Sequence, residues 1–482
     1  MSLLRNLFAR QAHDRERLPG EGVPLRRVLG VRALIAVGLG TMLGGIFSTV
    51  GSGSNAAGPA VIAAFGLSGV TCVFVALCYA ELASMVPVAG SAYTYAYAAL
   101  GEFVAWVIGW DLILEYGFSV APLAATLSAS VQQLLAKVGL PLPAWAQTAH
   151  VAFAHGGVDV AHTQVDVIAA VAIVLLAILL AIGIRESAGT NGALVVIQLV
   201  ALVAFVLGLA GAVRPGAYHP FAPLGLSGIV TSAALVFFAY IGFDTVTVAS
   251  EEAKNPVRDV PRAIIGSLIV GAVLFTAVAA VAVGVVAWDK IDPDAGMLDA
   301  VKHAGSNPVL FALVLAGTVT GTFASMLTSL LGQIRIFYVM SRDRLLPRAF
   351  GSVNARTQTP IVTTMITGVI VATVAALVPL TQLLKLVNIG TFSAFVIVCA
   401  GVMVLRFTHP AAARPFRVPF GPVAVPAIGI ALCAWLTLEG LDGLTWLRFL
   451  LWFAVGLVVY GLYGYHNSLL RRPRANPEEP SA

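Results

Sequence analysis

Two adjacent glycines, Gly44 and Gly45, lie near the middle of the apolar stretch 33–55, and the hydroxyl residues Ser48 and Thr49 follow them. Inside an apolar span, the backbone can leave the helical state only where protein or a water-filled cavity satisfies its polar groups. A helix that opened at this pair would direct free N–H groups, at the positive end of its second half, toward a carboxylate. The alternative is that the glycines only let neighbouring helices approach closely.

A second interruption lies in the apolar stretch 226–250, which contains Gly242 and the acid Asp244. An ionisable group in such a span is costly unless it is paired or hydrated, so Asp244 is a candidate functional residue. Carbonyl groups freed at this break could accept hydrogen bonds from an ammonium group. Breaks in the first and sixth spans are the arrangement expected if spans 1 to 5 and 6 to 10 are inverted repeats.

Three further side chains could take part in binding. Glu115 lies within the third span, where it could pair with a cationic group or make a structural hydrogen bond between helices. Ser325 and Met326 could line a subsite for a substrate side chain in the eighth span, or simply pack in the core. A bulky thioether at Met326 would limit the depth of that subsite and favour small neutral substrates. Glu81, near a span end, is expected to interact with basic loop residues.

The composition requires lipid as the solvent for most of the chain. Only 11% of the 482 residues are charged, 59% are hydrophobic, and the mean hydropathy is +0.92. We therefore predict an all-α integral membrane protein with about twelve spans. The expected spans are residues 33–55, 60–86, 101–125, 165–184, 190–213, 226–250, 262–288, 306–339, 361–379, 382–407, 421–439 and 444–465.

The distribution of basic residues predicts the orientation. If the N-terminus is cytoplasmic, most of the 28 Lys and Arg residues face the inside, and the outer loops hold Lys137, Arg214, Lys290, Lys302, Lys385 and Arg448. This asymmetry predicts a multi-pass protein with both termini in the cytoplasm. Residues 1–32 would form a cytoplasmic N-terminal segment, and the polar residues 466–482 a disordered cytoplasmic tail.

Several other classes of protein gain no support. The basic residues form no continuous patch, so we expect no nucleic-acid partner. The four cysteines and eight histidines show no metal-ligand spacing, and we expect no cofactor, no metal and no enzymatic activity. A channel or nutrient receptor remains an alternative, although no selectivity-filter signature or sizeable soluble domain is evident.

Four segments together resemble signatures of the amino acid-polyamine-organocation superfamily, and within it the bacterial twelve-helix form of the cationic amino acid transporter family. They are residues 76–95, 109–116, 237–256 and 333–343. The resemblance implies a 5+5 inverted repeat, called the LeuT-like fold, over residues 33–407, followed by two more helices over 408–465. It further implies an amino-acid transporter of the bacterial inner membrane that works by alternating access, with spans 1 and 6 discontinuous. A small single-span membrane protein could bind at its edge.

The resemblance also implies binding residues. Gly44, Gly45 and Ile46 would donate backbone N–H groups to the substrate α-carboxylate. The carbonyls of Met42, Phe238, Ala239 and Ile241 would accept hydrogen bonds from the α-amine, and Phe238 would be a lid over the substrate. The segment Leu43-Gly44-Gly45-Ile46 is shorter than the Gly-x-Gly of the family, so the register of the carboxylate donors is open.

One departure concerns energy coupling. Bacterial relatives commonly carry a lysine in span 5 that is thought to couple protonation to transport, and this chain has Gln198 there. A glutamine amide cannot titrate at physiological pH. The substitution favours uniport or exchange, unless Asp244 or Glu115 binds the proton instead. Small neutral substrates such as alanine and cationic ones such as arginine or lysine both remain open.

Overall fold

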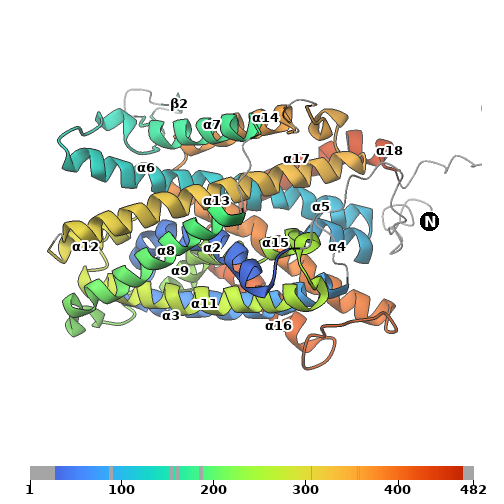
Figure 1. Ribbon diagram of the computed structural model, residues 1–482, viewed down its shortest axis with the longest axis horizontal. Coiled ribbons are helices and arrows are strands. Elements are labelled where there is room, and N and C mark those ends of the chain that lie inside the picture. Colours follow the sequence, from blue (N-terminus) through green and yellow to red (C-terminus); the bar gives the residue numbers. More distant parts are fainter. Residues whose placement is uncertain are drawn as a thin grey trace, which may run out of the picture.

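A computed structural model of the protein describes residues 28–469, apart from 86–90, 151–152, 155–156, 159–162, 184–187, 306, 355–356 and 358. The described part is almost entirely helical (Figure 1). Two strands, β1 (Phe153–Ala154) and β2 (Gly157–Val158), pair antiparallel in one loop. Most of the predicted N-terminal segment and C-terminal tail lies outside the described residues.

Eight apolar stretches within the described residues are long enough to cross a membrane, and three shorter apolar helices accompany them. The first stretch holds both α2 (Val31–Ala57) and α3 (Val61–Met85), so the total is twelve spans, as predicted. Spans 3 to 12 are α5 (Glu102–Leu112) with the π-helical η2 (Ile113–Gly117) and α6 (Val120–Lys137), α7 (Val167–Ala181), α8 (Ala188–Leu209), α9 (Gly225–Val236) with η6 (Phe237–Tyr240) and α10 (Thr245–Val248), α11 (Pro256–Val285), α13 (Pro308–Arg342), α14 (Ile361–Leu377), α15 (Leu380–Thr408), α16 (Ala424–Gly440), and α17 (Gly443–Val459) with η9 (Tyr460–Gly464) and α18 (Tyr465–Asn467).

Shorter elements connect these spans. The helix α4 (Ser91–Ala99) lies between spans 2 and 3, and α12 (Gly296–His303) lies between spans 7 and 8. The remaining elements are single 3-10 turns: η1 (Gly58–Ala60), η3 (Ala144–Ala146), η4 (Ala210–Ala212), η5 (Pro215–Tyr218), η7 (Ser250–Glu252) and η8 (Arg348–Gly351).

The helix packing repeats with a period of five spans. The helix α2 packs on α9, α3 on α11, α6 on α13, and α7 on α14. Exchanging spans 1 to 5 with spans 6 to 10 also relates the neighbours of spans 5 and 10. In span 5, α8 packs on α13 and α2; in span 10, α15 packs on α5 and α9. In Figure 1, α7 and α14 lie together along one edge of the molecule, and α3 and α11 along the opposite edge. This packing confirms the inverted repeat of the LeuT-like fold.

Span 6 is interrupted where the sequence predicted. The helix α9 ends at Val236, a 3-10 turn follows, and Ile241 is extended with ψ 128°. Gly242 then adopts φ +122°, a conformation that L side chains rarely take, before α10 begins at Thr245. The break therefore depends on the glycine.

The break predicted in span 1 is absent from this structure, because α2 is a continuous helix through Gly44 and Gly45. In this structure the two glycines let neighbouring helices approach closely, which is the alternative explanation given above. A Cβ at Gly44 would lie 2.3 Å from the Oγ of Ser325 and 2.8 Å from the carbonyl oxygen of Gly321. A continuous helix keeps the backbone hydrogen bonds of an apolar span satisfied while its glycines admit a close neighbour.

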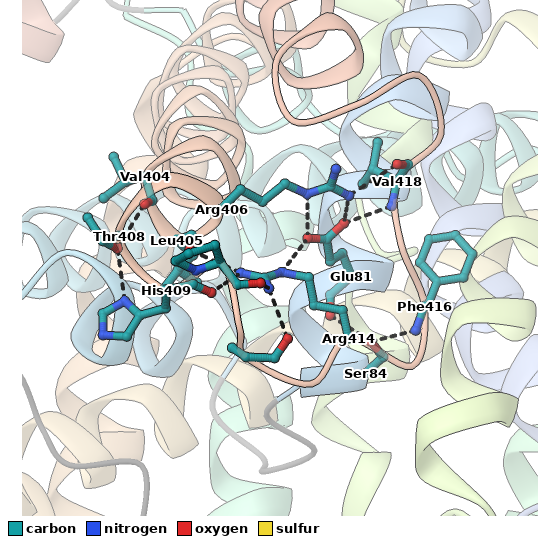
Figure 2. Close-up of polar contacts among 12 residues, drawn as sticks. Glu81, Ser84, Val404, Leu405, Arg406, Thr408, His409, Arg414, Phe416 and Val418 are labelled. Atoms are coloured by element: carbon teal, nitrogen blue, oxygen red, sulfur yellow. Dashed lines mark hydrogen bonds and ion pairs between the residues drawn. The ribbon is translucent and has the colours of Figure 1, made fainter.

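A buried ion-pair cluster fastens the segment after α15 to α3 (Figure 2). Arg406 donates two hydrogen bonds to the carboxylate of Glu81, and the Nε of Arg414 lies 3.4 Å from Glu81 Oε1. The backbone N–H of Val418 donates to the Oε2 of Glu81 over 2.7 Å. The expected interaction of Glu81 with basic loop residues is confirmed, and it ties span 2 to the end of span 10.

Candidate functional site

The predicted binding segments of spans 1 and 6 are in direct contact. A Cβ on Gly45 would lie 2.7 Å from the Cα of Ala239 and 3.0 Å from the carbonyl oxygen of Phe238. Such distances mean that only a glycine fits here without moving the backbone of span 6. Gly44 is also the central residue of the 27-residue helix α2. The contact therefore lies halfway along the span, as a midplane substrate site requires.

These residues are closed off from the surface of the protein. Met42, Ile46 and Ala239 have no exposed surface, Phe238 is 3% exposed, and Ile241 is partly buried. Met42 directs its side chain toward α11, since its Cε would lie 2.9 Å from a Cβ at Gly271. Because α2 is continuous, the N–H groups of Gly44, Gly45 and Ile46 lie within the helix.

The eighth span, α13, contributes the third wall of this region. The Oγ of Ser325 donates toward two carbonyl oxygens of α2, that of Thr41 at 2.9 Å and that of Gly40 at 3.2 Å. Met326, the next residue, is 1% exposed. Ser325 therefore contacts the backbone of span 1 one helical turn before the glycine pair. The subsite role of Met326 stays a prediction.

Gln198 of α8 lies next to this wall. It has no exposed surface, and its Cγ would lie 3.3 Å from a Cβ at Gly321, the residue whose carbonyl approaches Gly44. Neither atom of its amide has a hydrogen-bond partner among the described residues. Gln198 thus occupies a place near span 1, as the resemblance implied for the coupling lysine, and its own role in coupling stays a prediction.

A polar cluster surrounds the break in span 6. The hydroxyl of Tyr116 donates a hydrogen bond to the Oδ2 of Asp244. Glu115 is 1% exposed, and the acids Asp244 and Asp111 lie near it. Within the described part of the chain, neither carboxylate oxygen of Glu115 has a hydrogen-bond partner. Asp111 accepts a hydrogen bond of 2.7 Å from Ser393 of α15, which fits the role of a helix-to-helix contact.

Glu115 and Tyr116 belong to the π-helical turn η2 (Ile113–Gly117), a local widening of span 3. Turns of this kind are rare and are frequently found at functional sites. The ring of Tyr116 lies against Gly332, where a Cβ would be 2.5 Å from it, and Gln333 lies against Gly117. The sequence analysis assigned no role to Tyr116 or Gln333. The glycines that pack against them, Gly332 against Tyr116 and Gly117 against Gln333, were a signal of close helix packing.

The segment before α12 covers the other end of α2. Ser52 and Asn55 donate hydrogen bonds to the carbonyl oxygens of Pro293 (3.1 Å) and Ile291 (3.3 Å). Burial, and then the neighbouring carboxylates of Asp292 and Asp166, raises the pKa of Asp294 to about 6. The loop that contacts the C-terminal end of span 1 therefore changes its charge in mildly acidic solution.

Metal binding finds no support in the described residues, which contain no group of three or more His, Cys, Asp or Glu side chains placed to hold an ion. Several buried polar groups, among them Asp244, Glu115 and Ser325, lie in spans 3, 6 and 8 beside the backbone of span 1 or beside one another.

Twelve spans in an inverted repeat, with a closed contact of spans 1 and 6 halfway through, define a membrane transporter of the LeuT-like fold. The chain belongs to the Amino acid permease family, whose profile matches residues 29–462. The predicted superfamily is thereby confirmed, and the family is one of permeases rather than enzymes.

Three relatives illustrate the range of the family. The chain is 40% identical over 452 residues to the Branched-chain amino acid permease BcaP of Bacillus subtilis (strain 168), covering 93% of this chain and 95% of the relative. It is 38% identical over 471 residues to the Methylthioribose transporter of the same organism, covering 97% and 100%. It is 37% identical over 398 residues to the vacuolar Cationic amino acid transporter 4 of Arabidopsis thaliana, covering 80% and 64%.

Proposed function

We propose that this protein carries neutral aliphatic L-amino acids across a bacterial inner membrane by alternating access, with both termini in the cytoplasm. The observation that carries the proposal is the contact of Gly45 in span 1 with Phe238 and Ala239 in span 6, halfway along α2 and closed to solvent. A carrier that alternates between two sides needs such a site between elements that can separate.

Substrate binding uses the backbone on both sides of this contact. The N–H groups of Gly44, Gly45 and Ile46 bind the α-carboxylate, and the carbonyls of Met42, Phe238, Ala239 and Ile241 bind the α-amine. Because α2 is continuous, its N–H groups become available only when the helix opens at the glycine pair. Glycine is the residue at which a helix opens at the lowest cost. Phe238 then acts as the lid over the substrate.

The surroundings of the site favour a neutral side chain. The atoms nearest to Gly44 and Gly45 come from Ser325, Gly321, Ala239 and Phe238, all of them uncharged. A cationic side chain within an apolar span requires an acid beside it. The bacterial relative named as a branched-chain amino acid permease, which is matched over 93% of this chain, supports the same choice.

For energy coupling we propose uniport or exchange, because Gln198 cannot release or take up a proton at physiological pH. Proton symport is a second candidate, and one observation favours it. The carboxylate of Glu115 is buried beside Asp244, and among the described residues it has no hydrogen-bond donor. A buried acid without a donor is a group that can hold a proton during the transport cycle.

Reconstitution of the purified protein in liposomes tests these proposals. Uptake of labelled leucine, alanine and arginine is measured with and without an inward proton gradient. We expect equilibration or exchange of leucine and alanine that does not depend on the gradient. Accumulation driven by the gradient would replace uniport with symport through Glu115 or Asp244, and preference for arginine would contradict the neutral substrate. Single-channel currents, or binding without flux, would indicate a channel or a receptor instead.

A further inference from the structure

Ser325 contacts the backbone of span 1 one helical turn before the glycine pair. Its side chain is buried in α13 at 1% exposure, and its Oγ lies 2.9 Å from the carbonyl oxygen of Thr41 and 3.2 Å from that of Gly40. Two nearby hydroxyls bond within their own helices instead: Thr49 donates to Gly45 and Thr322 donates to Thr318. Ser325 is thus a hydroxyl of span 8 that reaches across to span 1.

The two carbonyls that it reaches have a specific relation to the glycine pair. In an α-helix the carbonyl of residue i accepts from the N–H of residue i+4. The continuous helix α2 therefore pairs the carbonyls of Gly40 and Thr41 with the N–H groups of Gly44 and Gly45. These are the N–H groups that the proposed function assigns to the substrate carboxylate.

Opening the helix would leave both carbonyls without donors. An unsatisfied carbonyl buried in an apolar environment costs about 1–3 kcal/mol, so an opening that frees two of them needs a replacement donor nearby. The hydroxyl of Ser325 is already within hydrogen-bond distance of both. It needs to move little to donate fully to either one.

We propose that Ser325 is a positioning residue for substrate binding: its single O–H donates to one of the two carbonyls, that of Gly40 or that of Thr41, when Gly44 and Gly45 turn their N–H groups to the substrate carboxylate. This inference rests on the proposed function, and it gives Ser325 a role on the helix backbone in place of the side-chain subsite. In the empty protein the hydroxyl is an additional donor, and in the bound state it is a necessary one.

The test compares binding with stability in the purified full-length protein. The wild type is first screened against the twenty standard L-amino acids by ligand-induced thermal shift, and the amino acid with the largest shift is used for calorimetry. For Ser325→Ala we expect a dissociation constant about tenfold higher, because one buried carbonyl loses its donor only in the bound state. The melting temperature of the empty protein should stay within about 2 °C of wild type.

Thr322→Val is the matched control. Thr322 lies about one turn earlier on α13, is fully buried, and donates within its own helix over 2.7 Å. The substitution removes a buried hydroxyl whose hydrogen bond stays within α13, so the dissociation constant should not change. If Ser325→Ala cannot be recovered, Ser325→Cys replaces the hydroxyl by a weak donor and should also weaken binding.

The outcomes separate the inference from the proposed function. A wild type that binds none of the amino acids contradicts the proposed function, and the inference fails with it. A wild type that binds, together with a Ser325→Ala or Ser325→Cys variant of equal affinity, overturns the inference alone. A purely structural role would instead lower the melting temperature of the empty protein and leave the affinity unchanged.

Discussion

The hydroxyl of Tyr116 donates a hydrogen bond to the Oδ2 of Asp244, and this bond joins the π-helical turn of span 3 to the interrupted span 6. Both residues are buried, at 3% and 0% exposure. The bond therefore holds spans 3 and 6 together in the closed arrangement described here.

Tyr116→Phe removes this bond and leaves the ring against Gly332. The carboxylate of Asp244 loses a donor in a buried environment, so the free energy of unfolding should fall by about 1–3 kcal/mol. Thermal unfolding of the purified protein in detergent measures the effect. Tyr79→Phe is the control, because the Tyr79 hydroxyl is also buried but has no hydrogen-bond partner within the described residues. Equal losses in the two variants would contradict a specific role for the Tyr116 bond.

The cluster around Glu81 makes a prediction about stability. Glu81→Gln would leave Arg406 and Arg414, which are 11% and 4% exposed, without a neutralising carboxylate. Removing one partner of a buried ion pair costs about 3–5 kcal/mol, so the melting temperature should drop sharply. Asp442→Asn is the comparison, since Asp442 pairs with Lys385 and its own side chain is 41% exposed. Exposed pairs contribute about 0–1 kcal/mol, and that variant should resemble wild type.

The loop before α12 predicts a pH dependence. The pKa of Asp294 is raised to about 6 by burial and by the carboxylates of Asp292 and Asp166. A carboxyl with a raised pKa destabilises the folded state once it ionises, so its cost is absent below about pH 4 and grows up to about pH 6. Asp294→Asn should therefore stabilise the protein at pH 7 by about 1–2 kcal/mol and have no effect near pH 4.

Unfolding of the wild type and Asp294→Asn across this pH range measures the difference. Asp289→Asn, at an exposed position in the same loop, is the control that should leave the profile unchanged. A stabilisation by Asp294→Asn that is equal at pH 4 and pH 7 would rule out ionisation as the cause.

The sequence was sufficient for the architecture. Apolar stretches of span length and the placement of Lys and Arg depend on local composition, so the twelve spans and the break at Gly242 could be predicted. The contact of Gly45 with Ala239 was also implied, through the resemblance to a family. Glycines of span 1 were ambiguous, because the same residue serves a helix that opens and a helix that packs closely.

The sequence does not reveal which residues of different spans contact each other. Tyr116 and Asp244 are 128 residues apart, and no local pattern pairs them. The π-helical turn that holds Glu115 and Tyr116 adds one residue to a turn of span 3, which periodicity alone does not reveal. The approach of Ser325 to the carbonyls of Gly40 and Thr41 likewise depends on the packing of α13 on α2.

Gln198→Lys tests whether the missing lysine accounts for the proposed uncoupled transport. A lysine placed in this fully buried position would lose its proton more readily than in water, so it could titrate during the cycle. We expect uptake by the variant to be stimulated by an inward proton gradient, whereas uptake by the wild type is not. Gln198→Met has a similar length and cannot titrate, so its uptake should stay independent of the gradient. A lysine variant that transports without responding to the gradient would contradict this role for position 198.

Gly45→Ala tests the contact on which the proposed function depends. The new Cβ would lie 2.7 Å from the Cα of Ala239, so spans 1 and 6 must move apart, at a cost of about 1–3 kcal/mol. We expect uptake of labelled leucine to fall by more than tenfold while the protein remains folded, as judged by its elution in size-exclusion chromatography. Gly66→Ala is the matched control on α3, because a Cβ there meets no atom within 4 Å. Since alanine favours a helix over glycine by about 1 kcal/mol, this control should transport normally and be slightly more stable. Normal uptake by Gly45→Ala would show that substrate does not pass through the contact of spans 1 and 6.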